Sequence, residues 1–600
     1  MGTCFTITAS GVVLNGNGFS IAGDNSGVDY GVYIQSANNV VVKNFAGIQS
    51  FNDGVYLYSN PQNALVTSNV IGPNSRSGVA LGQASLGNII EGNTIKNNPF
   101  GVYIDDVYVQ QNIIRNNVFA NNTNGAYLKG QNADFNKLIG NTFTGTSNHS
   151  IILLGGSTEV RSNTIRGTTL SNDLNVAGVF VSSTDGYGRE HTIIGNNISF
   201  MRKGVSLNSA SSNTIFDNFL SNNYEGISLL SGTNNIIGNN TISGDTTGML
   251  GFNGIYLNGA TDNRIERNAI TNNYFGISLE SSDRNQISNN IARQNNKVFA
   301  NGAVSGVGIA LLRSNDNQIT DNDASRQAHG IHIYLSENNL VNGNTISNNL
   351  YDGIKMDGGG KNVTGGNIGG NHNVSNNFLS GNGIMTIYGG KGDIISKNTL
   401  VGGGIYTATA ESTITSNDLT EGGIIISSTE SNKVMQNRIT RSPIGIDFSF
   451  ADSNIVSENT ILNSTLYGAI FSFSDDNYLT KNTISGSGIY GVALEFSHFN
   501  TITENIFSAN AQNIFLGRRS ESNQISGNTG ASSSSSLMQQ QQKTTEVKKG
   551  PRVGEAFTPA KNKTATTIIS LPAAAPTAPI RLFAKGTGSG AIGSGSLRNY

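Results

Sequence analysis

The stretch GISLLSGTNNIIGNNTISG, which runs from Gly226 to Gly244, shows the pattern that decides the fold. Ile and Leu, singly or in pairs, alternate with Gly, Asn and Ser, and no residue of the stretch is charged. Gly and Asn accept left-handed and turn backbone at little steric cost. The pattern therefore predicts short strands between frequent turns, and none of these strands is long enough to form a core by itself.

The same pattern recurs through most of the chain. The glycines that open an apolar strand are spaced by 22 to 32 residues in the middle of the chain and by 23 residues farther on; they are Gly204, Gly226, Gly254, Gly276, Gly308, Gly330 and Gly353, and then Gly445, Gly468 and Gly491. The longer steps contain insertions, such as 244–252 and 293–306. Such spacing indicates a repeat protein of roughly 21 or 22 units.

Each unit offers three short strands and three turns, enough to close one triangular coil. Stacked coils let every strand hydrogen-bond to its counterpart one repeat later, which merges the small apolar segments into one core. We therefore predict an all-β fold, a single-stranded right-handed parallel β-helix with three sides over residues 1–529. We expect the corner asparagines both to adopt the αL conformation and to form a side-chain ladder between coils.

Other repeat architectures fit less well. Leucine-rich repeats would need a regular Leu frame and a helix-compatible segment, and a propeller would need units of about 40 residues. The calcium-binding nonapeptide is matched only superficially by DGGGKN at 357–362.

Residues 530–600 differ from the rest of the chain. They are rich in Ser, Gln, Pro and Gly, and they carry nine Lys or Arg against two Glu, whereas the repeats carry an excess of acidic residues. This composition predicts a disordered basic tail. The apolar segments 566–571 and 580–583 could order on a protein partner, and specific nucleic-acid binding is not expected because aromatic residues for base stacking are missing.

The remaining composition restricts the class of protein. A single cysteine, Cys4, excludes an internal disulfide framework. We see no run of about 18 apolar residues and therefore expect no membrane span. The N-terminal residues read as strand and turn, not as a secretory signal.

The repeats resemble a known family. GISLLSGTNNIIGNNTISG, GISLESSDRNQISNN (276–290) and GIHIYLSENNLVNGNTISNN (330–349) are similar to the parallel β-helix repeats of NosD-like proteins. These are also called carbohydrate-binding and sugar-hydrolysis domains, within the pectin-lyase-like superfamily. The resemblance covers about residues 5 to 529. It implies a periplasmic, surface or extracellular protein that handles polysaccharide, but the repeat motif itself is structural and specifies no activity.

One candidate carbohydrate site is a column of tyrosines. The second position after the strand glycine is occupied by Tyr33, Tyr56, Ala80, Tyr103 and Tyr127, with Tyr58 beside the column. Tyrosine rings offer flat apolar faces and a hydroxyl, which suits stacking on sugar rings. The competing interpretation is an aromatic ladder that stabilises the sheet surface.

A second candidate site is polar and lies on two consecutive repeats. Aligning HGIHIYLSEN (329–338) with DGIKMDGGG (352–360) directs six side chains outward: His329, His332, Tyr334, Asp352, Lys355 and Asp357. We expect His329 near Asp352 and His332 near Lys355, about 4.8 Å apart. Such a group can perform acid–base chemistry. The competing interpretation is an ordinary solvated face.

These features favour a surface or extracellular β-helix that binds, and in one version processes, polysaccharide. If it is an enzyme, a uronate lyase or epimerase fits better than a hydrolase, because Asp352 and Asp357 are too far apart along one strand for an inverting pair. The alternative is a non-catalytic rod or virion fibre, for instance a trimer, tethered by its tail. No metal site and no cofactor is predicted.

Overall fold

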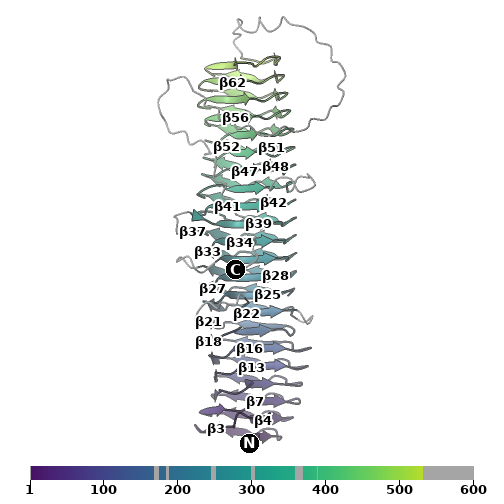
Figure 1. The fold of residues 1–600 in the computed structure, drawn as a ribbon, viewed down its shortest axis with the longest axis vertical. Helices are drawn as coiled ribbons and strands as arrows, with labels where there is room; N and C mark the ends of the chain where they lie inside the picture. Colours follow the sequence, from purple (N-terminus) through teal and green to yellow (C-terminus); the bar gives the residue numbers. More distant parts are fainter. Residues whose placement is uncertain are drawn as a thin grey trace, which may run out of the picture. The chain divides into compact units, whose positions relative to one another are not determined.

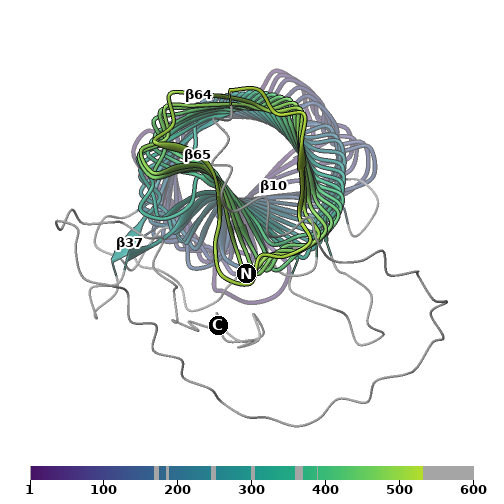
Figure 2. The ribbon, with the colours of Figure 1, turned by 90° about the horizontal axis from the view of Figure 1, so that it is seen from above.

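The computed structural model describes residues 2–167, 175–183, 188–244, 252–298, 304–358, 369–387 and 390–530. It confirms the predicted fold: these residues wind into a right-handed parallel β-helix whose coils stack on one another (Figures 1 and 2). Within these ranges every regular element is a strand, and no helix is long and apolar enough to cross a membrane. The predicted tail, with its partner segments, lies outside the described residues.

The coils are built from three parallel sheets. Sheet B runs from β2 (Val13–Asn15) to β66 (Gln524–Ser526), and sheet C from β3 (Ser20–Ala22) to β64 (Ile506–Ser508). Sheet C is interrupted in one coil, where its strand is reduced to the single residue Asp323, which pairs with Ile291 and Thr345.

Sheet A has the longest strands and carries all of the predicted site residues except Asp352, which lies two residues before β44 (Ile354–Asp357). Each strand pairs with the strand one coil later. Its 22 strands are β1 (Phe5–Ile7), β4 (Tyr30–Gln35), β7 (Asp53–Tyr58), β10 (Ser77–Leu81), β13 (Phe100–Asp105), β16 (Asn124–Lys129), β19 (Ile151–Leu153), β22 (Ala177–Ser182), β25 (Lys203–Asn208), β28 (Glu225–Leu230), β31 (Asn253–Asn258), β34 (Phe275–Glu280), β39 (Val307–Leu312), β41 (His329–Tyr334), β44 (Ile354–Asp357), β47 (Ile384–Ile387), β50 (Ile405–Thr407), β53 (Ile424–Ser427), β56 (Ile444–Ser449), β59 (Tyr467–Ser472), β62 (Tyr490–Glu495) and β65 (Gln512–Leu516).

Alternation along each strand sends one set of side chains into the coil and the other set outward. Ile227 pairs in register with Ile255, and both are fully buried, as are the corresponding residues of most other coils. The strand glycine is required for this packing. A Cβ at Gly226 would lie 2.5 Å from the carbonyl oxygen of Gly254 and 2.6 Å from Cγ2 of Ile242. Glycine, which has no Cβ, is therefore required where the start of a sheet A strand packs against sheet C.

Asparagine ladders connect the coils at their corners, as predicted. An unbroken ladder of twenty asparagines runs from Asn69 to Asn528, and from the second member on each Oδ1 accepts the backbone N–H of the ladder asparagine one coil earlier at 2.9–3.0 Å. The expectation that one residue does both jobs is wrong. Asn289 has φ of 56° and is exposed, whereas its neighbour Asn290 is buried in the ladder.

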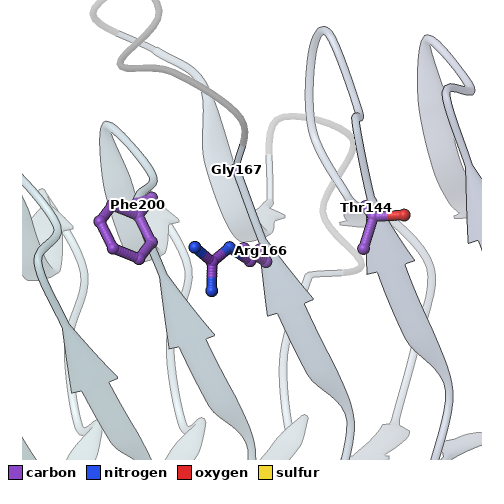
Figure 3. Close-up of a pocket in the computed structure, with 4 residues that line it drawn as sticks. All are labelled: Thr144, Arg166, Gly167 and Phe200. Atoms are coloured by element: carbon purple, nitrogen blue, oxygen red, sulfur yellow. The ribbon is translucent and has the colours of Figure 1, made fainter.

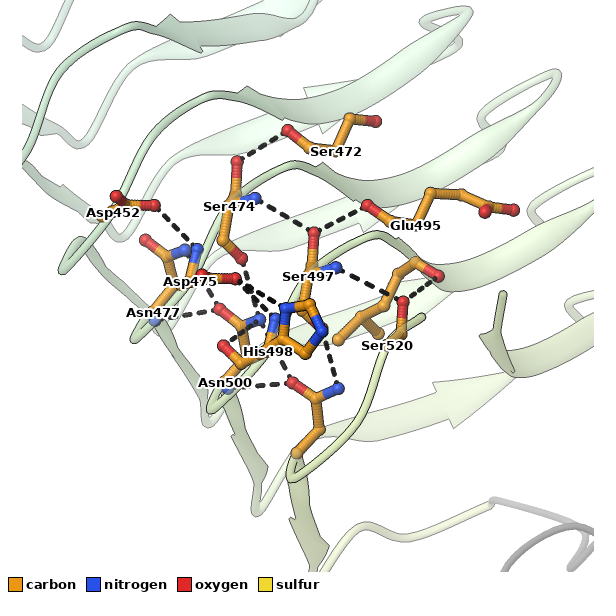
Figure 4. Close-up of polar contacts among 12 residues, drawn as sticks. Asp452, Ser472, Ser474, Asp475, Asn477, Glu495, Ser497, His498, Asn500 and Ser520 are labelled. Atoms are coloured by element: carbon orange, nitrogen blue, oxygen red, sulfur yellow. Dashed lines mark hydrogen bonds and ion pairs between the residues drawn. The ribbon is translucent and has the colours of Figure 1, made fainter. Parts of the chain in front are cut away.

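A second ladder runs along the corner between sheets A and B. It includes serines as well as asparagines, so a serine hydroxyl can also accept a backbone N–H bond from the coil before it. Figure 4 shows its C-terminal part, where Asn477 and Asn500 are bonded in series and a parallel column of serines runs beside them. At the same corner Oδ1 of Asp475 accepts the backbone N–H of His498 at 2.6 Å. These contacts are between neighbouring coils and indicate a structural role.

Candidate functional site

The predicted polar cluster is brought together by the pairing of β41 with β44. The register places His332 opposite Lys355 and Tyr334 opposite Asp357, as expected from the sequence. Between them Ile331 and Ile333 point inward and are fully buried, so the polar residues occupy the outer face of sheet A. Alternation fixes this orientation, because a strand that buries its Ile column must direct the intervening residues outward.

One polar contact and one ion pair hold the cluster. Nδ1 of His329 lies 3.3 Å from Oδ2 of Asp352, and Nζ of Lys355 lies 3.7 Å from Oδ2 of Asp357. The four side chains are between 14% and 22% exposed, so they are mostly removed from water but still reachable. The sequence analysis missed Tyr351, whose ring centroid lies 5.2 Å from that of His329. Its position directly before Asp352 was the only available signal.

His332 is the most perturbed member of the cluster. Burial, with smaller contributions from the charges of Lys355 and His329, lowers the pKa of the His332 imidazole to about 3. The ring is therefore neutral at neutral pH. Its Nε2 atom is buried and has no hydrogen-bond partner within the protein. A neutral, unpartnered imidazole nitrogen next to a lysine can accept a proton or a hydrogen bond from a bound molecule.

The tyrosine column exists, but its ring faces are largely used by neighbouring rings. Tyr33 stacks on Tyr56 with centroids 5.7 Å apart, and Tyr103 stacks on Tyr127 at 5.4 Å. The Arg76 guanidinium bridges the two pairs, 5.6 Å from the ring centre of Tyr56 and 5.2 Å from that of Tyr103. The remaining member, Tyr58, packs against Tyr56 at 5.4 Å. Ring edges and hydroxyls, more than ring faces, are thus presented outward.

A second polar group on the same face was not predicted. Glu225 and Ser228 on β28 lie opposite Asn253 and Tyr256 on β31. Ser228 is fully buried and Asn253 is 3% exposed. The Glu225 carboxylate lies 4.0 Å from Nζ of Lys203, too far for a hydrogen bond. All of these residues stand at outward positions of the repeat, so the register could have found them. It could not have shown that they lack partners.

Unpartnered polar atoms are concentrated on this face. Among the described residues, twelve buried side-chain nitrogen or oxygen atoms have no hydrogen-bond partner within the protein, and six of them belong to outward residues of sheet A: Asn124, Glu225, Ser228, Asn253, His329 and His332. Buried polar atoms are nearly always paired in folded proteins. Five of the six fall in the two clusters described above, although Nδ1 of His329 has the Asp352 carboxylate at 3.3 Å and Oε2 of Glu225 has the Lys203 ammonium at 4.0 Å. Both clusters therefore hold polar atoms that make no hydrogen bond within the protein.

A hollow elsewhere on the molecule has less chemistry to offer. It is lined by Thr144, Arg166, Gly167 and Phe200 at the edge of sheet C (Figure 3). The Arg166 guanidinium lies 4.7 Å from the centre of the Phe200 ring. The flat face of the guanidinium is therefore already in contact with an aromatic ring. None of the predicted site residues lines this hollow.

Two family profiles match the chain, each over more than half of its length. The profile described as periplasmic copper-binding protein (NosD) matches residues 156–299 and 364–548, and the profile described as right-handed β-helix region matches residues 7–170 and 249–401. The chain belongs to the NosD family of β-helix proteins. No curated protein sequence matches it significantly.

Solved structures with a similar winding include enzymes and an adhesin. DFA-IIIase from Arthrobacter chlorophenolicus A6 is 13% identical, with 60% of this chain and 84% of that chain covered and a TM-score of 0.28. The mannuronan C-5 epimerase AlgE4 A-module from Azotobacter vinelandii is also 13% identical, with 64% and 91% covered and a TM-score of 0.25. The Streptococcus pneumoniae surface adhesin PfbA is 12% identical, with 60% and 84% covered and a TM-score of 0.32. Similarity at this level carries no argument about activity.

The copper in the family description can be tested against the donors present. In the described part of this NosD-family chain, no group of three or more His, Cys, Asp or Glu side chains is placed to hold a metal ion. Three of the six histidines are already engaged, because Nδ1 of each accepts a backbone N–H bond from a neighbouring coil; these are His149, His191 and His372. The described residues therefore do not fit a copper site, which would favour imidazole and thiolate or thioether donors.

Proposed function

We propose that this protein binds polysaccharide along the outer face of sheet A, with the cluster of β41 and β44 taking an acidic sugar unit. The observation that carries the proposal is the concentration of buried, unpartnered polar atoms on that one face. A polysaccharide is rich in hydroxyl groups that can supply the missing hydrogen bonds, and its extended shape matches a row of coils. The family description as periplasmic supports a location outside the cytoplasm.

Within the cluster, the residues divide into a cation and a proton acceptor. Lys355 can pair with the carboxylate of a uronate unit, and Nε2 of His332 can accept the proton from the carbon beside that carboxylate. The C–H bond then breaks, its electron pair moves into an enolate, and the Lys355 ammonium stabilises the negative charge. In the lyase branch the glycosidic C–O bond at the adjacent carbon breaks as the C=C double bond forms, and the departing oxygen takes a proton from water. In the epimerase branch water returns a proton to the carbon from the other face, which gives the epimer.

Substrate binding should also partly offset the lowered pKa of His332, which is due mainly to burial. The charge of Lys355 is one cause of its lowered pKa. A uronate carboxylate that pairs with Lys355 neutralises that charge and should raise the pKa of His332. The proton acceptor is thus strengthened only when an acidic sugar is present, which favours uronates over neutral sugars at this position.

The test uses the full chain with alginate, polygalacturonate and hyaluronan. We expect binding of at least one of these polymers, and we expect Lys355→Ala to weaken it by about tenfold or more, corresponding to the loss of one charge-assisted contact. The matched control is Lys391→Ala, because Lys391 also pairs with a carboxylate, at 3.5 Å, but is half exposed and lies at a corner between sheets A and B. Equal losses of affinity in both variants would show that binding depends on overall positive charge and not on Lys355 in particular.

Catalysis is measured in a separate assay from binding. The appearance of ultraviolet absorbance from an unsaturated uronate, or of a new anomeric signal in NMR, would identify a lyase or an epimerase, and His332→Gln should abolish either one. Binding without any product on all three polymers would leave a carbohydrate-binding protein and would refute the proton-transfer step.

A further inference from the structure

The unpredicted polar group on β28 and β31 carries an inference of its own. We infer that Glu225, Ser228 and Asn253 form a second saccharide site, which takes a neutral, hydroxyl-rich sugar unit. Oε2 of Glu225, Oγ of Ser228 and Oδ1 of Asn253 are buried, and none has a hydrogen-bond partner within the protein. They lie on two paired strands, with Glu225 directly opposite Asn253.

The neighbouring donors are already committed or too far away. The Tyr256 hydroxyl donates to Oε2 of Glu280 at 2.8 Å and accepts from Nδ2 of Asn258 at 2.9 Å. Burial is the main reason that the pKa of Tyr256 is raised, so this hydroxyl keeps its proton and its present role. The ammonium of Lys203 is 4.0 Å from Glu225. A donor from outside the protein can therefore complete these contacts.

The chemistry of the three atoms selects the ligand. A carboxylate and an amide oxygen accept hydrogen bonds and repel an anion, which argues against a uronate carboxylate at this position. A calcium ion would need six to eight oxygen ligands, and the Lys203 ammonium beside the carboxylate disfavours any cation. Hydroxyl groups of a neutral sugar supply donors without charge. They match an arrangement of acceptors that would otherwise remain unsatisfied.

The position of this site relates it to the proposed function. β28 and β31 precede β41 by four and three strand pairings in sheet A. At about 4.8 Å for each pairing, the two sites lie roughly 14–19 Å apart on one face. The inference rests on the proposed function only for the idea that a single polysaccharide spans both sites. Binding of a neutral sugar at Glu225 stands independently.

The experiment measures binding of cellohexaose, laminarihexaose and maltohexaose to the full chain by calorimetry, and of the acidic polymers in parallel. We expect at least one neutral hexasaccharide to bind, and we expect Ser228→Ala and Asn253→Ala each to weaken that binding by about fivefold to tenfold. Because the acceptors are buried, association should be slower than about 10⁵ M⁻¹s⁻¹.

Ser206→Ala is the matched control. Ser206 lies opposite Ser228 one coil earlier and is 2% exposed, but its hydroxyl is not among the unpartnered buried atoms. Its replacement should leave binding within about twofold. Ser228→Ala should not lower the melting temperature, because it removes a buried hydroxyl that has no partner.

The outcomes separate the two proposals. Failure of all three neutral hexasaccharides to bind, or equal losses in Ser206→Ala and Ser228→Ala, overturns the second site, whatever happens with uronates. Conversely, neutral binding that depends on Ser228 supports the second site even if the acidic polymers do not bind. If Ser228→Ala binds as well as the unmodified protein but melts earlier, the hydroxyl has a structural partner and the inference is wrong.

Discussion

Replacing Asn290 with Ala should destabilise its coils far more than the same replacement at its sequence neighbour Asn289. Oδ1 of Asn290 accepts the backbone N–H of Asn268 at 3.0 Å and its side-chain Nδ2 at 2.9 Å. Nδ2 of Asn290 donates to the carbonyl of Ile265 at 2.8 Å and to Oδ1 of Asn322 at 3.0 Å. Four hydrogen bonds are lost together.

The magnitude follows from which groups are left behind. The buried N–H of Asn268 loses its acceptor, which costs about 1–3 kcal/mol, and each of the other bonds contributes about 1 kcal/mol net. The expected loss is about 4–6 kcal/mol of local stability. Asn289 is exposed and has φ of 56°, so Asn289→Ala costs only the αL penalty of about 1–2 kcal/mol.

The assay must resolve single coils, because a stack of repeats need not unfold as one unit. Hydrogen exchange of amides in 264–293, read by mass spectrometry, reports the local opening free energy. We expect exchange in this segment to accelerate strongly in Asn290→Ala and only slightly in Asn289→Ala, with the strands near residue 100 unchanged in both. Equal acceleration in the two variants would refute the assignment of separate roles to the two asparagines.

The other predictions concern pH, packing and the tyrosine column. Three histidines whose rings are shielded from water have pKa values lowered to about 3 or 4, so the unfolded chain binds more protons than the folded one as pH falls below about 6.5; they are His191, His332 and His372. The pKa of Asp393, raised by burial to about 6, acts in the opposite sense, so unfolding near pH 5 should take up about two protons net, and a pH-independent melting temperature between 6.5 and 4.5 would contradict this. Gly226→Ala should lose about 1–3 kcal/mol in chemical denaturation, because the new Cβ meets backbone at 2.5 Å; an unchanged midpoint would mean that the coil can shift at no cost. Tyr103→Phe removes the hydroxyl that donates to Asp105 at 2.8 Å but keeps the ring stack, so a loss of glycan affinity in this variant would show that ring edges bind sugar, and a loss only in Tyr103→Ala, with a lower melting temperature, would show a structural ladder.

The sequence alone predicted the winding and the positions of outward residues. Both follow from local rules. Alternation after the strand glycine directs His332 and Lys355 outward, and the repeat length sets which residues meet on the next coil. Counting from Gly330 and Gly353 pairs His329 with Asp352 and His332 with Lys355, and in the structure the members of each pair lie on neighbouring coils. Repeat folds allow this because each coil contacts mainly its neighbours.

The tertiary structure decided which outward residues lack partners. Glu225 and Asn253 stand in predictable positions, but whether a buried oxygen is satisfied depends on side-chain conformations and on distances such as the 4.0 Å to Lys203. The separate roles of Asn289 and Asn290 and the mutual stacking of Tyr103 and Tyr127 likewise depend on backbone angles and ring orientations. Sequence spacing determines which residues are neighbours on successive coils. Hydrogen bonding and desolvation depend on differences of fractions of an ångström, and only the folded structure sets such distances.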